Sequence, residues 1–257
     1  MHDDFIAAAE AAADAAGAVI RPLFRSRLLV EAKGDASPVT EADREAERTI
    51  RALLAERFPD HGMLGEEFGA TGIGAEYVWV IDPIDGTRAF VTGRPLFGTL
   101  IGLLHHGRPV LGLIDQPATG ERWIGAAGRP LMFRGPMGGT PGCRPCAALA
   151  EAELSCTSPS MFTEAEAPRF AAVRDAARRV TWGGDCYSYG LLALGLVDAV
   201  VESDLKPWDW VPLAPVIEAA GGRLVDWSGA PLDLEGPGQV VAVGDPALLP
   251  EILALLR

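Results

Sequence analysis

The chain has 257 residues, 49% of them hydrophobic, so it is long enough to bury a substantial core in one large domain or two smaller ones. Its formal net charge of −13 argues against nucleic-acid binding, because nucleic-acid readers contact phosphates through clustered lysines and arginines. An acidic protein can still bind a phosphorylated metabolite where divalent cations lie between the two sets of negative charge.

The N-terminal segment predicts a helix from about Asp4 to Phe24, with a stripe of alanines along it. Its opening, MHDDF, is acidic, and Glu10, Asp14 and Arg21 interrupt the apolar residues behind it. This pattern fits neither a signal peptide nor a membrane span. We therefore expect a cytoplasmic protein that does not bind a membrane.

A second helix is predicted between Thr40 and Phe58, before Pro59. Thr40 and Asp43 have the spacing of a capping box, and apolar residues recur behind them at helical period. After a glycine-rich loop, short apolar runs separated by turn residues predict a largely antiparallel sheet with strands at 77–81, 97–104, 110–115 and 121–127.

Histidines and cysteines give little sign of a metal or redox site. His105 and His106 precede Gly107 in a predicted exposed hairpin turn, and the four histidines show no metal-ligand spacing. Cys143 and Cys146 form a CxxC in a Gly/Pro-rich loop, but no second CxxC or neighbouring histidine completes a zinc site. We expect thiols without a role.

The Gly/Pro-rich interval 135–145 is the predicted boundary between an N-terminal α+β half, 1–140, and a C-terminal α/β half, 141–257. Beyond it, the pattern predicts strands at 154–157, 197–202, 223–226 and 240–243. The helices between and after them are predicted at 164–179, 186–194, 208–220 and the C-terminus. Such alternation indicates a second layer built around its own sheet.

The stretch WVIDPIDGTRAF places Asp82 and Asp85 at the end of a predicted strand. Asp-Pro commonly makes only a turn, and aspartates cap helices. However, a helix that begins near Gly86 would present free backbone N–H groups beside two carboxylates. That arrangement suits a phosphate held together with cations.

Further acids are expected near the same strand end, because Mg²⁺ prefers a few hard oxygen ligands. Glu66 lies in GEE before a glycine-rich loop, and Asp209 lies between two tryptophans at the start of an apolar helix. Asp43 is a third candidate. Each of the three has a simpler explanation: Glu66 belongs to a solvated acidic turn, Asp43 is the acid of the capping box, and Asp209 caps its helix.

The succession of GEE, DPIDGT, and WD before a helix that ends in GG resembles the inositol monophosphatase family of magnesium-dependent, lithium-sensitive phosphatases. The resemblance extends from KGDASPVTEAD to EAAGGRLVDWSG. It implies an α/β fold layered as an α/β/α/β/α sandwich, usually a homodimer, with two or three Mg²⁺ ions in each active site.

The same resemblance implies ligands and catalytic groups. The implied metal ligands are Glu66, Asp82, the Ile84 carbonyl, Asp85 and Asp209, with Asp43 more remotely at a third ion. Gly86 and Thr87 match the family's phosphate-binding turn. Thr87 and Glu66 match the pair that orients the attacking water. Lys33 and Thr40 match a mobile segment that folds over the site.

The expected reaction is in-line attack of an activated water, without a covalent phosphoenzyme. The haloacid dehalogenase phosphatases also carry an Asp-Gly-Thr phrase, but their nucleophilic aspartate lies two positions before the second aspartate. Here Asp82 and Asp85 are three positions apart. A metal-binding or regulatory protein without catalysis is disfavoured, because it would not need the water-orienting pair.

For the substrate, GTRAF, FGTLIGLL and GGDCYSYGLLALG resemble the histidinol-phosphate phosphatases of this family. Because histidinol phosphate carries an ammonium group and an imidazole, an acidic wall is expected, with Asp185, Glu202 and Asp204 as candidates. The simpler explanation of all three is that they are ordinary strand-end and loop acids. Arg88 either joins the substrate contacts or only marks the subfamily. Inositol 1-phosphate, fructose 1,6-bisphosphate and 3'-phosphoadenosine 5'-phosphate remain open.

Overall fold

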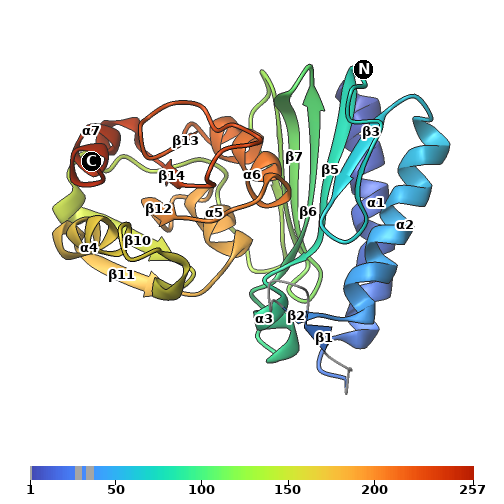
Figure 1. The fold of residues 1–257 in the computed structure, drawn as a ribbon, viewed down its shortest axis with the longest axis horizontal. Coiled ribbons are helices and arrows are strands. Elements are labelled where there is room, and N and C mark those ends of the chain that lie inside the picture. Colours follow the sequence, from blue (N-terminus) through green and yellow to red (C-terminus); the bar gives the residue numbers. More distant parts are fainter. Residues whose placement is uncertain (1, 27–30, 33–37) are drawn as a thin grey trace.

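Helical layers and β-sheets alternate across the molecule in the order α/β/α/β/α, as predicted (Figure 1). The computed structural model describes residues 2–26, 31–32 and 38–257. The predicted mobile-segment residue Lys33 lies outside these ranges. Within them, no helix combines the length and the apolar character that crossing a bilayer requires.

The larger sheet has seven strands in the order β4-β3-β5-β6-β7-β8-β9. All neighbouring strands are antiparallel except β3 and β5. The strands are β3 (Gly62–Gly65), β4 (Gly69–Thr71), β5 (Tyr77–Asp85), β6 (Gly98–His105), β7 (Arg108–Gln116), β8 (Glu121–Ala126) and β9 (Met132–Arg134). The four predicted strands are present. β3, β4 and β9 were not predicted because they are short, and glycine occupies both ends of β3 and the start of β4.

Two long helices cover the outer face of this sheet: α1 (His2–Leu23) and α2 (Glu41–Arg57). The alanine stripe of α1 is fully buried, so small side chains let the helices and the sheet pack closely. The predicted capping box at the start of α2 is present, with Thr40 and Asp43 bonded reciprocally. The short β1 (Glu31–Ala32) and β2 (Pro38–Val39) pair antiparallel beside this layer.

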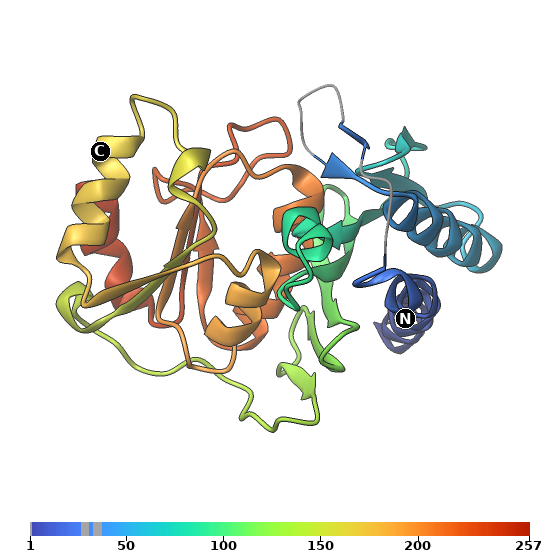
Figure 2. The same ribbon diagram turned by 90° about the horizontal axis from the view of Figure 1, so that it is seen from below.

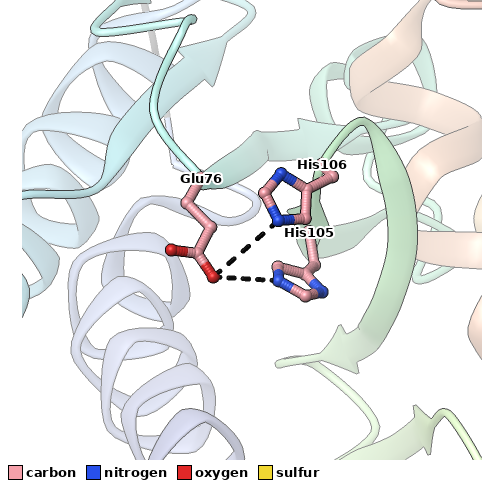
Figure 3. Close-up of side chains that lie close together, drawn as sticks. All are labelled: Glu76, His105 and His106. Carbon is pink, nitrogen blue, oxygen red and sulfur yellow. Dashed lines mark hydrogen bonds and ion pairs between the residues drawn. The ribbon is translucent and has the colours of Figure 1, made fainter.

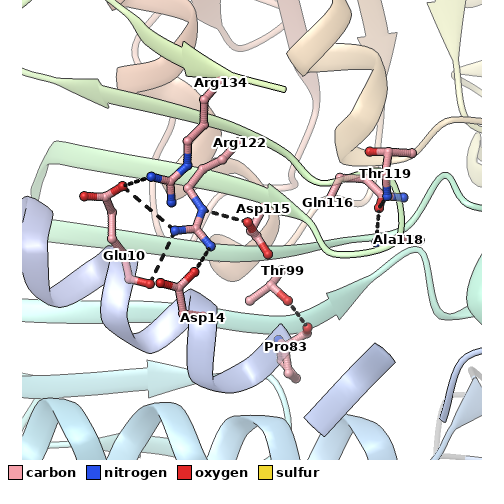
Figure 4. Close-up of polar contacts among 10 residues, drawn as sticks. All are labelled: Glu10, Asp14, Pro83, Thr99, Asp115, Gln116, Ala118, Thr119, Arg122 and Arg134. Carbon is pink, nitrogen blue, oxygen red and sulfur yellow. Dashed lines mark hydrogen bonds and ion pairs between the residues drawn. The ribbon is translucent and has the colours of Figure 1, made fainter. Parts of the chain in front are cut away.

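A buried ionic network ties α1 to β7 and β8 (Figure 4). Arg122 Nε donates to Asp115 Oδ1 at 2.7 Å, and Arg122 Nη2 donates to Asp14 Oδ1 at 2.7 Å. Glu10 lies 3.1 Å from the Arg134 guanidinium at the edge of the network. Because Arg122 and Asp115 are 5% and 6% exposed, each charge depends on the other for a partner.

The central layer consists of α5 (Cys186–Leu192) and α6 (Pro207–Ala219). Glycines pair across three neighbouring strands, Gly102 with Gly112 and Gly112 with Gly125, and α6 crosses this row. A Cβ on Gly112 would lie 1.8 Å from the Pro212 carbonyl oxygen, and one on Gly125 would lie 2.1 Å from that of Pro215. The glycines therefore allow the α6 backbone to rest directly on the sheet.

The second sheet has five strands in the order β11-β10-β12-β14-β13. They are β10 (Glu153–Cys156), β11 (Arg179–Trp182), β12 (Ala199–Glu202), β13 (Arg223–Val225) and β14 (Val240–Val243). The helices α4 (Ala167–Ala176) and α7 (Leu249–Leu255) pack on its outer face. The helix predicted from Glu164 to Arg179 is too long, because the last of these residues begins the unpredicted strand β11.

Short elements complete the chain. The 3₁₀ helices are η1 (Leu149–Glu151), η2 (Pro159–Met161) and η3 (Pro246–Leu248). The helix α3 (Thr87–Val91) follows β5 at one end of the larger sheet, and Figure 2 looks onto this end.

All four cysteines are free thiols, and burial raises the pKa of Cys143 to about 11. A thiol with such a pKa is a poor nucleophile at neutral pH.

Candidate active site

The end of β5 brings two aspartates together. The pairing of β5 with β6 shifts register between Asp82 and Asp85, and the Ile84 N–H donates to Asp82 Oδ1 at 3.0 Å. The buried Thr99 hydroxyl donates to the Pro83 carbonyl at 2.8 Å and holds the irregular backbone in place (Figure 4). The strand thus continues through the predicted turn, and its irregularity sets the direction of both carboxylates.

Asp209 reaches the same point from the first turn of α6. Oxygen atoms of Asp82, Asp85 and Asp209 all lie within 4.8 Å of one another. Asp209 Oδ2 also accepts the backbone N–H of Lys206 at 2.7 Å. The helix-cap explanation and the metal-ligand prediction are therefore both compatible with its position, because a carboxylate has two oxygens.

The three aspartates repel one another in a buried setting. Burial raises the pKa of Asp82 well above its usual value, and the charges of Glu66, Asp85 and Asp209 raise it further. Burial and the neighbouring carboxylates raise the pKa of Asp85 and of Asp209 to about 7. Protons or divalent cations must offset this repulsion, and an all-oxygen donor set suits a hard cation such as Mg²⁺.

Glu66 follows β3 in the turn before β4. Its backbone N–H donates to the Ile81 carbonyl at 3.2 Å, one residue before Asp82. Its charge and a hydrogen bond between the two side chains contribute to the raised pKa of Asp82. The structure thus brings Glu66 to the aspartate cluster, as the sequence predicts.

The turn that carries Glu66 is held by Glu47, which sequence reasoning missed. Glu47 is fully buried on α2, and its carboxylate accepts the N–H groups of Glu67 at 2.7 Å and Phe68 at 3.2 Å. Arg51 donates to the same carboxylate at 2.7 Å. The one sequence signal was that Glu47 lies four residues after Asp43, on the same helix face.

Thr87 and Asp43 meet at the start of α3. The Thr87 hydroxyl lies 3.1 Å from the Ile84 carbonyl and 3.3 Å from Asp43 Oδ1, so it can donate to either oxygen. The other oxygen of Asp43 accepts the Thr40 N–H and hydroxyl at 2.8 and 2.6 Å. Burial raises the pKa of Asp43. The structure thereby brings together Thr40 of the predicted mobile segment, Asp43 of the predicted third-ion site and Thr87 of the predicted water-orienting pair.

Gly86 sits at the tight turn between β5 and α3. Its φ of 81° lies in the left-handed region, and a Cβ there would lie 2.9 Å from the Asp185 carboxylate. Only glycine accommodates both the backbone conformation and this close approach. The first N–H groups of α3 have no partner within the helix and can donate hydrogen bonds to an anion's oxygens.

The predicted substrate acids line one cavity of about 200 Å³ together with Asp85 and Asp209. Burial and the charges of Asp85 and Glu202 raise the pKa of Asp185 to about 8, and Arg88 opposes this shift. Arg88 and Asp185 also line an adjacent cavity, so Arg88 lies beside the candidate substrate space.

The other two acids of the wall differ from Asp185. Glu202 is buried and accepts hydrogen bonds from the Thr157 N–H at 2.7 Å and the Tyr189 hydroxyl at 2.8 Å. Asp204 is exposed and bonded to Lys206 Nζ at 2.5 Å. The cavity wall is therefore acidic, but its three carboxylates differ in how freely they can face a ligand.

Known proteins resemble the chain over its full length. The sequence profile of the inositol monophosphatase family matches residues 1–257. The chain is 47% identical over 242 residues to the bifunctional phosphatase IMPL2 of Arabidopsis thaliana. This alignment covers 93% of the chain and 69% of IMPL2. It is 38% identical over 266 residues to a histidinol-phosphatase of Mycobacterium tuberculosis, covering 100% and 98% of the two chains.

Solved structures agree with this result. An inositol monophosphatase from Zymomonas mobilis superposes with a TM-score of 0.90 at 45% identity, covering 99% of this chain and 98% of that one. Family members are metal-dependent phosphatases, in keeping with the carboxylate cluster at the end of β5. The chain belongs to the inositol monophosphatase family.

Proposed function

We propose that the protein is a Mg²⁺-dependent phosphatase that hydrolyses L-histidinol phosphate to L-histidinol and phosphate in histidine biosynthesis. The observation that carries the reaction is the cluster of Asp82, Asp85 and Asp209 beside Thr87 and the start of α3. The similarity to histidinol-phosphatases of Mycobacterium tuberculosis and Chlorobaculum parvum, each at 38% identity, supports the substrate.

The residues present fit the metal that this reaction requires. Two or three Mg²⁺ ions would be held by Glu66, Asp82, the Ile84 carbonyl, Asp85 and Asp209, with Asp43 more remotely at the third. When bound, they would neutralise the phosphate and acidify a coordinated water. The raised pKa values of Asp82, Asp85 and Asp209 support this assignment, because a cation removes their mutual repulsion.

The protein's own groups then position the reactants. The backbone N–H groups at Gly86 and Thr87 bind the phosphate oxygens, while Thr87 and Glu66 orient the attacking water. The water oxygen attacks phosphorus in line with the ester oxygen, the P–O ester bond breaks, and the leaving alkoxide takes up a proton. No side chain becomes phosphorylated.

An acidic cavity wall favours histidinol phosphate over inositol 1-phosphate. Asp185, Glu202 and Asp204 line the space beside the aspartate cluster. They would attract the ammonium group and imidazole of histidinol, whereas inositol presents only hydroxyl groups. Inositol 1-phosphate is the second candidate, because a structure at 45% identity is an inositol monophosphatase.

Phosphate release with Mg²⁺ from four substrates tests the proposal: histidinol phosphate, inositol 1-phosphate, fructose 1,6-bisphosphate and 3'-phosphoadenosine 5'-phosphate. We expect the highest kcat/KM with histidinol phosphate. A higher value with another of the four refutes the substrate and leaves the reaction standing. Absence of phosphate release from all four by folded protein contradicts the reaction as proposed.

Asp85→Asn tests the metal assignment separately. The amide keeps the side-chain volume but removes the charge, so kcat should fall by at least about a hundredfold. Phosphate release at saturating Mg²⁺ measures this, with circular dichroism to confirm folding. Near-normal turnover would contradict the proposed ligand set.

We further propose that the protein acts in the cytoplasm as a homodimer. We also propose that residues 1–140 and 141–257 form its two structural halves. The seven-stranded sheet lies within the first range and the five-stranded sheet within the second, which supports the division. Sedimentation of the purified protein would test the dimer.

A further inference from the structure

The end of the larger sheet away from α3 carries a second group of metal-ligating side chains: Glu76, His105 and His106 (Figure 3). One ligand atom from each lies within 4.8 Å of the other two. His105 Nε2 is 3.0 Å and His106 Nε2 is 3.9 Å from the same oxygen, Glu76 Oε1. The histidines show no metal-ligand spacing along the sequence, because the third member of this group, Glu76, lies 29 residues before His105.

The backbone holds these three residues together without any ion. His106 N–H donates to the Glu76 carbonyl at 2.9 Å, and Tyr77 pairs with His105 across β5 and β6. His106 and Gly107 have φ values of 49° and 75°, the two positive angles of a type I′ hairpin turn. Binding an ion would therefore cost little further conformational entropy of the backbone.

Ring stacking fixes the first histidine further. The Tyr77 and His105 rings stack with centroids 4.5 Å apart and planes 13° apart. The His105 and His106 ring centroids are 4.4 Å apart, so both imidazoles lie on the same side of the turn as Glu76. The side chains of Glu76, His105 and His106 are 58%, 37% and 70% exposed, which leaves the group open to ions from solvent.

The donor set differs in kind from the aspartate cluster. Two imidazole nitrogens and one carboxylate oxygen suit Zn²⁺, Ni²⁺ or Cu²⁺, whereas Mg²⁺ prefers oxygen ligands. Tetrahedral Zn²⁺ with bonds of about 2.0–2.1 Å places its ligand atoms about 3.3 Å apart. The separations of 3.0 and 3.9 Å to Glu76 Oε1 are close to this value, so small side-chain rotations complete a three-ligand site with water as the fourth ligand.

We propose that Glu76, His105 and His106 bind one Zn²⁺ ion, or another borderline transition-metal ion, at a site separate from the active site. Tyr77 and Asp85 lie at opposite ends of the nine-residue β5, about 25 Å apart at the usual strand rise. The ion joins the start of β5 to the β6–β7 turn. It stabilises this end of the sheet and takes no part in hydrolysis.

Zinc binding to untagged, chelator-treated protein tests the site, in excess Mg²⁺ to occupy the aspartate cluster. Equilibrium dialysis against Zn²⁺ in this Mg²⁺ buffer should show one more bound zinc ion per chain in the wild type than in His105→Asn/His106→Asn. Asparagine tolerates the left-handed backbone of the turn, so the double variant should fold. The measured quantity is the difference in bound zinc between the wild type and the double variant. Zinc bound at the aspartate cluster is the same in both proteins and does not contribute to this difference.

Two single variants refine the test. Glu76→Gln should weaken zinc binding by at least about tenfold, and the exposed acid of α2, Glu45→Gln, should leave it unchanged. Mg²⁺-dependent turnover should be equal in all these proteins. Equal zinc stoichiometry and affinity in the wild type and the double-histidine variant would overturn the proposal, whatever the outcome of the phosphatase assays.

Discussion

Acidic side chains in the active site divide their two oxygens between two tasks. Asp209 Oδ2 and Asp85 Oδ2 accept backbone N–H groups of Lys206 and Cys186, at 2.7 and 2.6 Å. Asp43 gives one oxygen to Thr40 and turns the other toward Thr87. The sequence presented capping and metal binding as alternatives for such residues, but in the structure capping occupies only one of the two carboxylate oxygens, so the two roles are compatible.

The buried Glu47 gives a prediction at this scale. In Glu47→Gln, an N–H donor replaces one of the oxygens that accept the hydrogen bonds of Glu67, Phe68 and Arg51. The turn that carries Glu66 should shift, and the Mg²⁺ concentration for half-maximal activity should rise about tenfold. Activity measured across a range of Mg²⁺ concentrations tests this.

The matched control is Glu45→Gln, a half-exposed position on the same helix. It should leave both the Mg²⁺ dependence and the melting temperature unchanged. A Glu47→Gln protein with a lower melting temperature but an unaltered Mg²⁺ dependence would show that Glu47 is only structural.

At the scale of elements, the glycine row under α6 determines where Asp209 lies. In Gly112→Ala the new methyl group would overlap the Pro212 carbonyl, so α6 must move away from the sheet. Overpacking of this kind costs about 1–3 kcal/mol in the free energy of unfolding. Because Asp209 moves with the helix, the Mg²⁺ requirement should also rise.

Urea unfolding and Mg²⁺-dependent activity measure the two effects. Gly74→Ala is the control, because nothing lies within 4 Å of a Cβ at that position. If Gly112→Ala were as stable and as active as Gly74→Ala, the close contact between α6 and the sheet would not position the ligand.

The network between α1, β7 and β8 gives the second prediction for elements. Arg122→Met leaves the buried Asp115 without its cation, and breaking such a pair costs about 3–5 kcal/mol in the free energy of unfolding. The double variant Asp115→Asn/Arg122→Met should recover much of this loss, because it buries no unpaired charge. Urea unfolding distinguishes the outcomes. A double variant less stable than Arg122→Met would contradict the explanation.

At the scale of the whole molecule, the aspartate cluster makes stability depend on pH and metal together. Asp85 and Asp209 have pKa values of about 7 in the folded chain, against about 3.9 when unfolded. Between these values the folded state holds more protons, so metal-free protein loses stability as pH rises from about 4 to about 7. Above about pH 7 both carboxylates are charged, and the repulsion between Asp85 and Asp209 is fully present.

Mg²⁺ should therefore raise the melting temperature more at pH 8 than at pH 5.5, because it replaces protons that leave on the alkaline side. Melting curves with Mg²⁺ and with a chelator, at both pH values, test this. Asp85→Asn should reduce the difference. An equal rise at both pH values would show that the cluster does not couple protons to metal.

Much of the architecture was predictable at the level of elements. The long helices and four strands of the larger sheet follow from hydrophobic period and capping residues, and the resemblance to the inositol monophosphatase family implied the layered arrangement. The strands β3, β4, β9 and β11 escaped prediction because their short segments lack the bounded apolar run that marked the equally short β12 and β14, and they take their stability from neighbouring strands.

The sequence by itself determined which chemical groups the site contains, because motifs such as DPIDGT and GEE place the acids at fixed positions along short segments. Only the tertiary structure decided how they meet. Glu47, Thr99 and the glycine row act through contacts between segments distant in the chain, and the site formed by Glu76, His105 and His106 exists because β5 and β6 pair there. Such proximity has no local signal in a sequence, since it arises when strands and helices pack.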